Sequence, residues 1–270
     1  MPELPEAETI RLDLEKRIVG LSIHSVKVID PRNLQNITPL QFIEKLTGQT
    51  FQSIFRKGKA LILQLNNDSY LIVQLGMTGQ LIVGKEFKDA HTKIVIKLSN
   101  NQYLIYNDQR IFGKIHLVKN LKQVPFLNQL GPDPIHKTFQ LSWLELNVKE
   151  KNAPIKTLLM NQHFLAGIGN IYASEILFRA GIRPQKISRR LKKDEIKKLF
   201  WSMKDVLKEA ITYRGSSMRN YLDSFGEQGK FKERIKVYDR ENQKCFLCQH
   251  PIQKIIQAGR STFFCRHCQQ

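Results

Sequence analysis

CFLCQHPIQKIIQAGRSTFFCRHC, residues 245–268, contains all four cysteines of the 270-residue chain. Two C-x2-C pairs are separated by 16 residues, a spacing typical of a tetrahedral structural zinc site. Two disulfides are the alternative, but the acidic N-terminus lacks the form of a secretion signal. His250 and His267 are expected to be bystanders, because four thiolates fill the site. We therefore predict one structural Zn²⁺ bound by Cys245, Cys248, Cys265 and Cys268.

The segment between the two cysteine pairs predicts a β-hairpin. Residues 252–257 and 261–264 have the composition of strands and flank Ala258-Gly259-Arg260. Arg260 is thus expected at the tip of a zinc-held hairpin, where a guanidinium suits phosphate binding or insertion into a groove. An ordinary solvated turn is the alternative.

The region before the finger divides into a helical part and a β part. Apolar residues recur at helical spacing from about residue 138 to 225, with expected helices at 138–149, 154–161, 170–180, 193–213 and 216–223. Closer to the N-terminus, two hairpins are expected, 60–65 with 70–75 and 93–98 with 103–106, each around an Asn-rich turn. Gly131-Pro132-Asp133-Pro134 between the two parts is the candidate hinge.

These patterns predict a multidomain α+β protein. An N-terminal β-sandwich domain that begins with a helix is expected over residues 1–130, and an interdomain linker with a first helix over 131–150. A helical domain is expected over 151–228 and a zinc-ribbon finger over 236–270.

The charge balance indicates a nucleic-acid partner. The chain has 43 Lys and Arg against 24 Asp and Glu, a net charge of +19, with basic clusters spread along its length. Cationic surfaces bind phosphates with release of counterions, although a generally basic surface without a partner is the alternative. Since no apolar run approaches the ~20 residues of a membrane span, we expect a cytoplasmic protein that does not bind membranes.

The first nine residues, MPELPEAET, combine a helix start with a candidate nucleophile. Pro5 and the acidic residues suit the first turn of a helix that ends before Gly20, but this leaves Pro2 and Glu3 unexplained. Removal of Met1 would free the amine of Pro2. An α-amino group titrates near ~8, against ~10.4 for lysine, so it can attack a carbonyl carbon while Glu3 transfers protons.

Four motifs in order along the chain resemble the bacterial formamidopyrimidine-DNA glycosylases. They are PELPEAET at 2–9, LGMTG at 75–79, GIGNIYASEILF at 167–178 and QAGRSTFFCRHC at 257–268. The resemblance implies a β-sandwich, a helix-two-turn-helix domain and a zinc finger. It also implies a monomeric base-excision repair enzyme that removes 8-oxoguanine and formamidopyrimidines from duplex DNA and cleaves the abasic strand by β,δ-elimination.

The resemblance also assigns roles residue by residue. Pro2 would form a Schiff base with the sugar, and Glu3 would protonate the ribose as it opens. Lys59 would assist catalysis near the lesion and its 3′ side. Arg260 would bind the flanking phosphates and act in the second elimination. Because the damaged base must leave the stack, a wedge is needed. The wedge residues implied are Met77, Arg110 and Phe112, and the DNA contacts implied are His91, Arg110, Lys151, Lys156, Asn170 and Tyr238.

Residue types alone favour core packing for Met77 and Phe112 over a wedge. The segment 215–219 and the loop after it resemble the part that closes over the flipped base. The sequence departs from the family pattern where it has Gln74, Gln109, Ile111, Thr92 and Lys93, which puts lesion preference and opposite-base discrimination in doubt but leaves the predicted chemical residues intact.

Three other functions remain open on the sequence. An endonuclease VIII-like glycosylase for oxidised pyrimidines shares the nucleophile and finger, but its start usually reads P-E-G-P-E where this chain has Leu4. A non-catalytic protein that binds damaged DNA would also need the positive charge, the zinc site and the wedge residues. It would have no need for Pro2 and Glu3 together. A zinc-ribbon transcription or RNA-binding protein would not explain the N-terminus. In the cell, association with the bacterial nucleoid through DNA is expected.

Overall fold

The computed structural model describes residues 2–87, 90–218 and 221–270, which form two compact units. The first unit comprises Met1–Asn128 and Tyr213–Lys232, and the second comprises Gln129–Thr212 and Glu233–Gln270. Residues 213–232 therefore return to the first unit, whereas the sequence places most of this segment in the helical domain of 151–228. The expected ranges 1–130, 131–150 and 236–270 remain predictions about domain boundaries.

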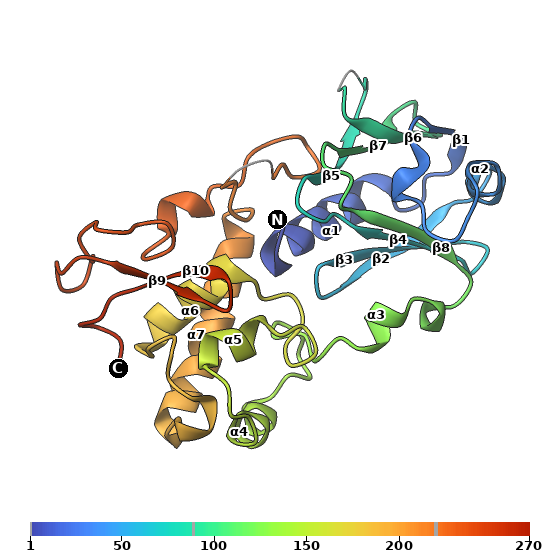
Figure 1. Ribbon diagram of the computed structural model, residues 1–270. Coiled ribbons are helices and arrows are strands. Elements are labelled where there is room, and N and C mark those ends of the chain that lie inside the picture. The colour runs from blue at the N-terminus through green and yellow to red at the C-terminus, as the bar shows by residue number, and fades with distance from the viewer. Residues whose placement is uncertain (1, 88–89, 219–220) are drawn as a thin grey trace. The chain divides into compact units, whose positions relative to one another are not determined.

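Two four-stranded antiparallel sheets form the layers of the first unit (Figure 1). One sheet has the strand order β1-β6-β7-β5 and the other β2-β3-β4-β8. The strands are β1 (Ile23–Val28), β2 (Phe51–Lys57), β3 (Ala60–Leu65), β4 (Tyr70–Gln74), β5 (Gly79–Gly84), β6 (Thr92–Leu98), β7 (Tyr103–Asp108) and β8 (Lys114–Val118). The helices are α1 (Leu4–Ile18), α2 (Pro39–Leu46) and α3 (Pro125–Asn128), with 3-10 turns η1 (Pro31–Asn33) and η2 (Leu121–Gln123).

The predicted first helix and both predicted hairpins are confirmed. Helix α1 starts with Pro5 in its first turn and ends before Gly20, whose φ of +84° favours glycine. Its buried residues Ile10, Leu14 and Ile18 join the core formed by the two sheets. The hairpins β3–β4 and β6–β7 turn at the Asn-rich segments because Asp and Asn tolerate the left-handed conformation.

The second unit contains four α-helices and the finger hairpin. The helices are α4 (Leu141–Lys149), α5 (Ile155–Met160), α6 (Asn170–Ala180) and α7 (Lys193–Thr212), with the 3-10 turn η3 (Ser188–Arg190). The hairpin consists of β9 (Gln253–Gln257) and β10 (Arg260–Phe264), and η4 (Phe231–Arg234) precedes it in the chain. Four of the predicted helices are therefore confirmed. Among the described residues, no helix is long and apolar enough to span a membrane.

The helix predicted over residues 216–223 is wrong for the described part of that stretch. Ser216 instead forms an isolated antiparallel bridge with Lys230, and the Ser217 hydroxyl donates to the Tyr221 carbonyl. Gly215 has a φ of +78°, which ends helical geometry before the stretch begins. Apolar spacing suggested a helix, but hydrogen bonds to distant residues hold this backbone in an irregular path.

Candidate functional site

The residues that precede α1 are held in place by the first helical turn. Pro2 and Glu3 are both buried, and the Glu3 side chain is among the most buried acidic groups of the unit. The Glu3 N–H donates to Glu6 Oε2 at 2.8 Å, which is one half of a capping box. The positive end of the helix dipole favours a carboxylate at this position. The predicted nucleophile and acid therefore lie next to each other at a fixed helix start.

Glu6 also joins α1 to residues 215–216, a contact that the sequence analysis missed. Its other carboxylate oxygen, Oε1, accepts a hydrogen bond from the Ser216 N–H at 2.7 Å. A Cβ on Gly215 would lie 2.8 Å from Glu6 Cγ, so glycine is required for this close approach. The start of the predicted base-closing segment is thereby placed beside the first turn of α1. Arg219, at the end of that segment, lies outside the described residues.

Lys59 lies in the turn between β2 and β3, and this turn is also tied to α1. Gly58 in the turn has a φ of +59°. Arg56 donates through Nη1 to the Gly58 carbonyl at 2.6 Å and through Nε to Glu8 Oε2 at 2.9 Å. Because Arg56 and Glu8 are largely buried, this ion pair orients the turn that carries Lys59. Two residues without a predicted role thus position a predicted catalytic lysine.

The three predicted wedge residues lie together on two neighbouring loops. The Arg110 Nη1 atom is 3.6 Å from the Met77 sulfur, and its guanidinium carbon is 4.6 Å from the centre of the Phe112 ring. The Phe112 side chain is 52% exposed, so core packing is wrong for this residue. Met77 is half-buried. The arrangement presents one cation beside two apolar groups, which suits insertion between bases.

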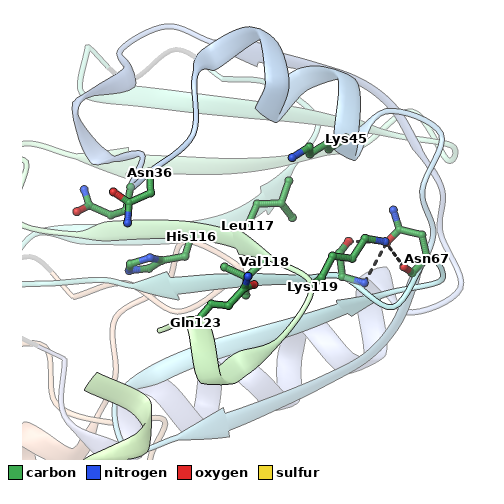
Figure 2. Close-up of a pocket in the computed structure, with 10 residues that line it drawn as sticks. Asn36, Lys45, Asn67, His116, Leu117, Val118, Lys119 and Gln123 are labelled. Atoms are coloured by element: carbon green, nitrogen blue, oxygen red, sulfur yellow. Dashed lines mark hydrogen bonds between the residues drawn. The ribbon is translucent and has the colours of Figure 1, made fainter. Parts of the chain in front are cut away.

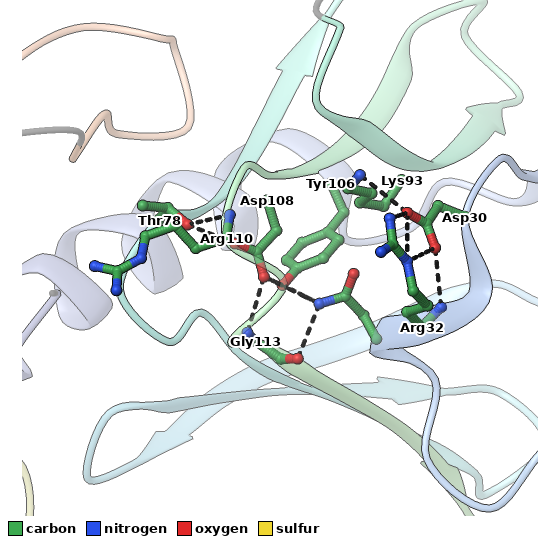
Figure 3. Close-up of polar contacts among 9 residues, drawn as sticks. Asp30, Arg32, Thr78, Lys93, Tyr106, Asp108, Arg110 and Gly113 are labelled. Atoms are coloured by element: carbon green, nitrogen blue, oxygen red, sulfur yellow. Dashed lines mark hydrogen bonds and ion pairs between the residues drawn. The ribbon is translucent and has the colours of Figure 1, made fainter.

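A buried carboxylate supports both wedge loops (Figure 3). Asp108 Oδ1 accepts from the Thr78 hydroxyl at 2.6 Å, and Oδ2 accepts from the Gly113 N–H at 2.8 Å and from Asn33 Nδ2 at 3.0 Å. The Thr78 hydroxyl in turn accepts from the Arg110 N–H at 3.0 Å. A fully buried charge needs such partners, and here they come from both loops and η1. Asn33 has no motif that would have revealed this role.

Gly113 and Tyr106 complete this network. A Cβ on Gly113 would lie 1.9 Å from the Tyr106 hydroxyl and 2.7 Å from the Gln74 carbonyl, so no larger residue fits without a shift. The Tyr106 hydroxyl donates to Asp108 Oδ2 at 3.2 Å. Burial, followed by the Asp108 charge, raises the pKa of Tyr106 well above its usual range, so the hydroxyl remains a donor. The glycine that ends the Q-R-I-F-G segment is therefore a packing requirement.

Three of the five departures from the family pattern lie in distinct environments. Ile111, beside the wedge, has a φ of +57°, which is a genuine outlier for a β-branched residue. Thr92 is buried and bonds through its hydroxyl to Asn107 Oδ1 at 2.9 Å. Lys93 forms an ion pair with Asp30 at 3.0 Å, and hydrogen bonds from Arg32 and from Lys93 hold the pKa of Asp30 well below its usual range (Figure 3).

In the second unit, Lys156 joins the helical part to the finger. Although the resemblance implies a DNA contact, its side chain is only 1% exposed. Its Nζ donates to Asn170 Oδ1 at 2.5 Å and to Thr262 Oγ1 at 2.7 Å, while Asn170 Nδ2 donates to the Ser261 carbonyl at 2.9 Å. The predicted residues Lys156 and Asn170 are thus brought together with β10, and Asn170 stands at the start of α6.

Arg260 is exposed at the tip of the finger hairpin, as predicted. It pairs with Gln257 across the two-residue turn Ala258-Gly259, in which both residues have a positive φ. Gln257 Nε2 donates to the Pro184 carbonyl at 3.2 Å. The hairpin is therefore anchored to the helical part on one side while the guanidinium faces solvent.

Glu175 on α6 positions the segment that carries Tyr238. The backbone N–H groups of Lys236, Val237 and Tyr238 each donate to its carboxylate at 2.9 Å. Burial raises the pKa of Glu175, and these three bonds oppose that shift by favouring the charged form. The Tyr238 ring lies edge-on to Phe263 of the finger, with 5.2 Å between ring centres. No sequence signal marked Glu175, which lies within the GIGNIYASEILF motif.

The remaining predicted contacts, His91 and Lys151, are exposed and lie in different units. Pro2, Glu3, Lys59 and the wedge belong to the first unit, while Lys151, Lys156, Asn170, Tyr238 and Arg260 belong to the second. The roles assigned to all of these residues remain predictions.

The four cysteine sulfurs form a site that fits zinc. Cys245 Sγ is 3.9 Å from Cys268 Sγ, Cys248 Sγ is 3.4 Å from Cys265 Sγ, and all four lie within 4.8 Å of one another. Tetrahedral coordination with Zn–S bonds of ~2.3 Å would separate the sulfurs by about 3.8 Å. All four cysteines are free, so the disulfide alternative is wrong. The stacked rings of His250 and His267 lie nearby.

Comparisons with known proteins cover the whole chain. The family model described as formamidopyrimidine-DNA glycosylase N-terminal domain matches residues 1–115, the corresponding H2TH domain matches 130–221, and a zinc finger found in FPG and IleRS matches 242–270. Formamidopyrimidine-DNA glycosylases of Chloroflexus aurantiacus and Rickettsia conorii are 40% and 39% identical, covering 100% of this chain and 98% and 99% of theirs.

Solved structures agree with these matches. Lactococcus lactis Fpg in complex with abasic-site DNA has a TM-score of 0.92 at 37% identity, with 99% of both chains covered. MutM (FPG) from Thermus thermophilus has a TM-score of 0.89 at 34% identity, covering 99% of this chain and 98% of that one. Together with the sulfur geometry, the matches confirm the predicted fold class and one structural zinc.

Proposed function

Because the chain belongs to the formamidopyrimidine-DNA glycosylase family, we propose that it removes oxidised purines from duplex DNA and then cleaves the abasic strand. The chain is a DNA glycosylase of base excision repair, and its partner is damaged double-stranded DNA. To this family-level activity the proposal adds two points. The lesions are oxidised purines, namely 8-oxoguanine and formamidopyrimidines, and the enzyme also carries out the lyase step. A monomer in the cytoplasm, associated with the nucleoid through DNA, is part of the same proposal.

The placement of Pro2 and Glu3 at the start of α1 is the observation that carries the proposal. Both residues are buried, and Glu6 fixes the Glu3 backbone as well as the Ser216 N–H. A secondary amine and a carboxylate held side by side form a nucleophile with a proton donor. A protein that only bound damaged DNA would have no use for this pair.

The chemistry requires the freed amine of Pro2. Its lone pair forms a bond to C1′ of the damaged nucleotide while the N-glycosidic bond breaks, and both the electron pair of that bond and the amine proton leave with the base. The C1′–O4′ bond then breaks to give the Schiff base, and Glu3 donates a proton to O4′. The covalent intermediate activates C2′ for loss of a proton, so that the 3′ phosphate leaves first and the 5′ phosphate follows.

Access to C1′ requires that the nucleotide leave the stack. Unstacking costs a few kcal/mol, and the least for a damaged base. The neighbouring Met77, Arg110 and Phe112 provide apolar groups to replace the lost stacking and a cation to contact the orphaned base. The buried Asp108 network keeps both wedge loops in register during this step.

Arg260 and Asn170 are both proposed to contact the phosphates that flank the lesion. Arg260 is exposed at a metal-stiffened tip, and Asn170 begins α6, where backbone N–H groups favour an anion. The net charge of +19 supplies the long-range attraction to DNA.

Borohydride trapping tests the proposal. Zinc-loaded protein, with Met1 removal verified by intact mass, is incubated with duplexes that contain 8-oxoguanine opposite cytosine, thymine glycol or no lesion. We expect a covalent adduct mainly on the 8-oxoguanine duplex, mapped to Pro2 by peptide analysis. An adduct mainly on thymine glycol would favour the endonuclease VIII-like alternative, and no adduct on any lesion would favour a binding protein.

Two variants sharpen this test. Pro2→Gly replaces the secondary amine with a primary amine and should lower the trapping rate, while an uncleaved N-terminal extension should abolish trapping because it converts the amine to an amide. Lys208→Met, on the exposed surface of α7, is the matched control and should trap at the wild-type rate. Full trapping by the extended protein would disprove the role of Pro2.

A further inference from the structure

Strand β8 (Lys114–Val118) forms an edge of the sheet β2-β3-β4-β8. It pairs with β4 on one side. On its other side, Leu34 forms an isolated parallel bridge with Ile115, and the Gln35 N–H donates to the Ile115 carbonyl at 2.9 Å. An edge strand presents unpaired backbone groups that can accept another strand.

The next backbone position along this edge is open. In an antiparallel ladder every second residue directs its N–H and C=O away from the partner strand, so Leu117 points to the same side as Ile115. Among the described residues, Leu117 makes no backbone hydrogen bond outside the ladder. The chain itself turns away after Gln35, because Asn36 has a φ of +57°. Beyond the Leu34–Ile115 bridge, the outward-facing backbone groups of Leu117 therefore have no partner strand in the described chain.

A groove of about 570 Å³ runs along this edge (Figure 2). Its volume lies within the ~300–1,000 Å³ of ordinary ligand sites. Lys45 from α2 and Lys119 just after β8 are both exposed and line it, together with the amides of Asn36 and Gln123. No described residue that lines the groove is acidic. The groove therefore combines positive charge with hydrogen-bond donors.

Two details of the lining support a polar occupant. The Lys119 ammonium donates to the Asn67 carbonyl at 2.5 Å, which holds this cation over the groove (Figure 2). The His116 Nε2 atom is buried and has no hydrogen-bond partner among the described residues. An unpaired buried polar atom is unfavourable, so a ligand that supplies a partner here would gain affinity.

We propose that the groove along β8 binds an extended acidic segment of a partner protein, which adds to the sheet as a further strand. The backbone of that segment would pair with Leu117, and its carboxylates would meet Lys45 and Lys119. DNA could satisfy the two cations, but it lacks the alternating N–H and C=O groups that a strand edge pairs with. None of the residues that line this groove is among those assigned above to the repair chemistry.

The test uses a fluorescein-labelled hexapeptide of alternating glutamate and valine and the full-length, zinc-loaded protein. Fluorescence anisotropy should show saturable binding. Lys45→Glu combined with Lys119→Glu should weaken binding by about tenfold or more, since each reversal replaces an attraction with a repulsion. The control pair Lys27→Glu and Lys208→Glu makes the same charge change on exposed sites elsewhere and should leave affinity within about twofold of wild type.

Backbone pairing is tested separately from charge. A hexapeptide N-methylated at every amide nitrogen keeps the carboxylates but has no backbone N–H donor on either edge, and its methyl groups prevent close pairing with a strand, so it should not bind. The Leu117 amide should show slower hydrogen exchange with the unmodified peptide. Equal binding by the methylated peptide, or no peptide binding at all, would overturn the proposal. Stronger protection of Leu117 by a single-stranded oligonucleotide would also overturn it, in favour of a nucleic-acid surface.

Discussion

Replacing Lys156 with methionine tests whether this lysine is an internal connection between the helices and the finger. Methionine keeps an unbranched apolar stem but removes the ammonium that donates to Asn170 and Thr262. Each hydrogen bond to a charged group contributes about 1.5–3 kcal/mol. Removal of a buried charge relieves a desolvation penalty that offsets part of this sum. We therefore expect the second unit to lose about 2 kcal/mol of unfolding free energy.

Tryptophan fluorescence can measure this loss selectively. The chain has 2 tryptophans, Trp143 and Trp201, and both lie in the second unit. For a urea dependence of about 1–3 kcal/mol per molar, the midpoint for Lys156→Met should fall by roughly 1 M. Affinity for a duplex with an abasic-site analogue should fall as well, because Asn170 loses the partner that orients its amide.

Lys151→Met is the matched control, because Lys151 is exposed in the same unit. Its stability should stay within about 0.5 kcal/mol of wild type. If Lys151 contacts a phosphate, its replacement should make the slope of log K for DNA binding against log salt concentration shallower by about 0.9. The reasoning would be refuted if Lys156→Met unfolded at the wild-type urea midpoint and its DNA binding lost as much salt dependence as that of Lys151→Met. Lys156 would then be a direct phosphate contact.

Three further predictions concern zinc and the wedge. Metal analysis should find one zinc per chain, and its removal by chelation should abolish DNA binding in a filter assay; metal-free protein that binds normally would contradict this. Asp108→Asn should destabilise the first unit by about 1–3 kcal/mol in thermal unfolding, because an amide cannot accept all the bonds made by the carboxylate. Phe112→Ala should leave stability nearly unchanged, since its side chain is 52% exposed, but slow single-turnover base excision; an unchanged excision rate would remove Phe112 from the wedge.

The sequence by itself determined the elements that depend on short-range patterns. Cysteine spacing predicted the zinc finger, the Asn-rich turns predicted two hairpins, and the first helix followed from its proline and its apolar face. Each of these features depends on residues close together in the chain, so local composition contains the required information. The roles of Pro2 and Glu3 came from the family resemblance and remain predictions.

Only the tertiary structure decided how these elements are held in position. Glu6 bonds to a residue 210 positions away, Asn33 to one 75 away, and Lys156 to one 106 away. Long-range pairing also replaces the predicted helix in the described part of 216–223, where Ser216 forms a bridge with Lys230. A hydrogen bond between distant residues leaves no periodic signal in either segment. Local patterns therefore identify elements, whereas the contacts that orient the site emerge only when the chain is folded.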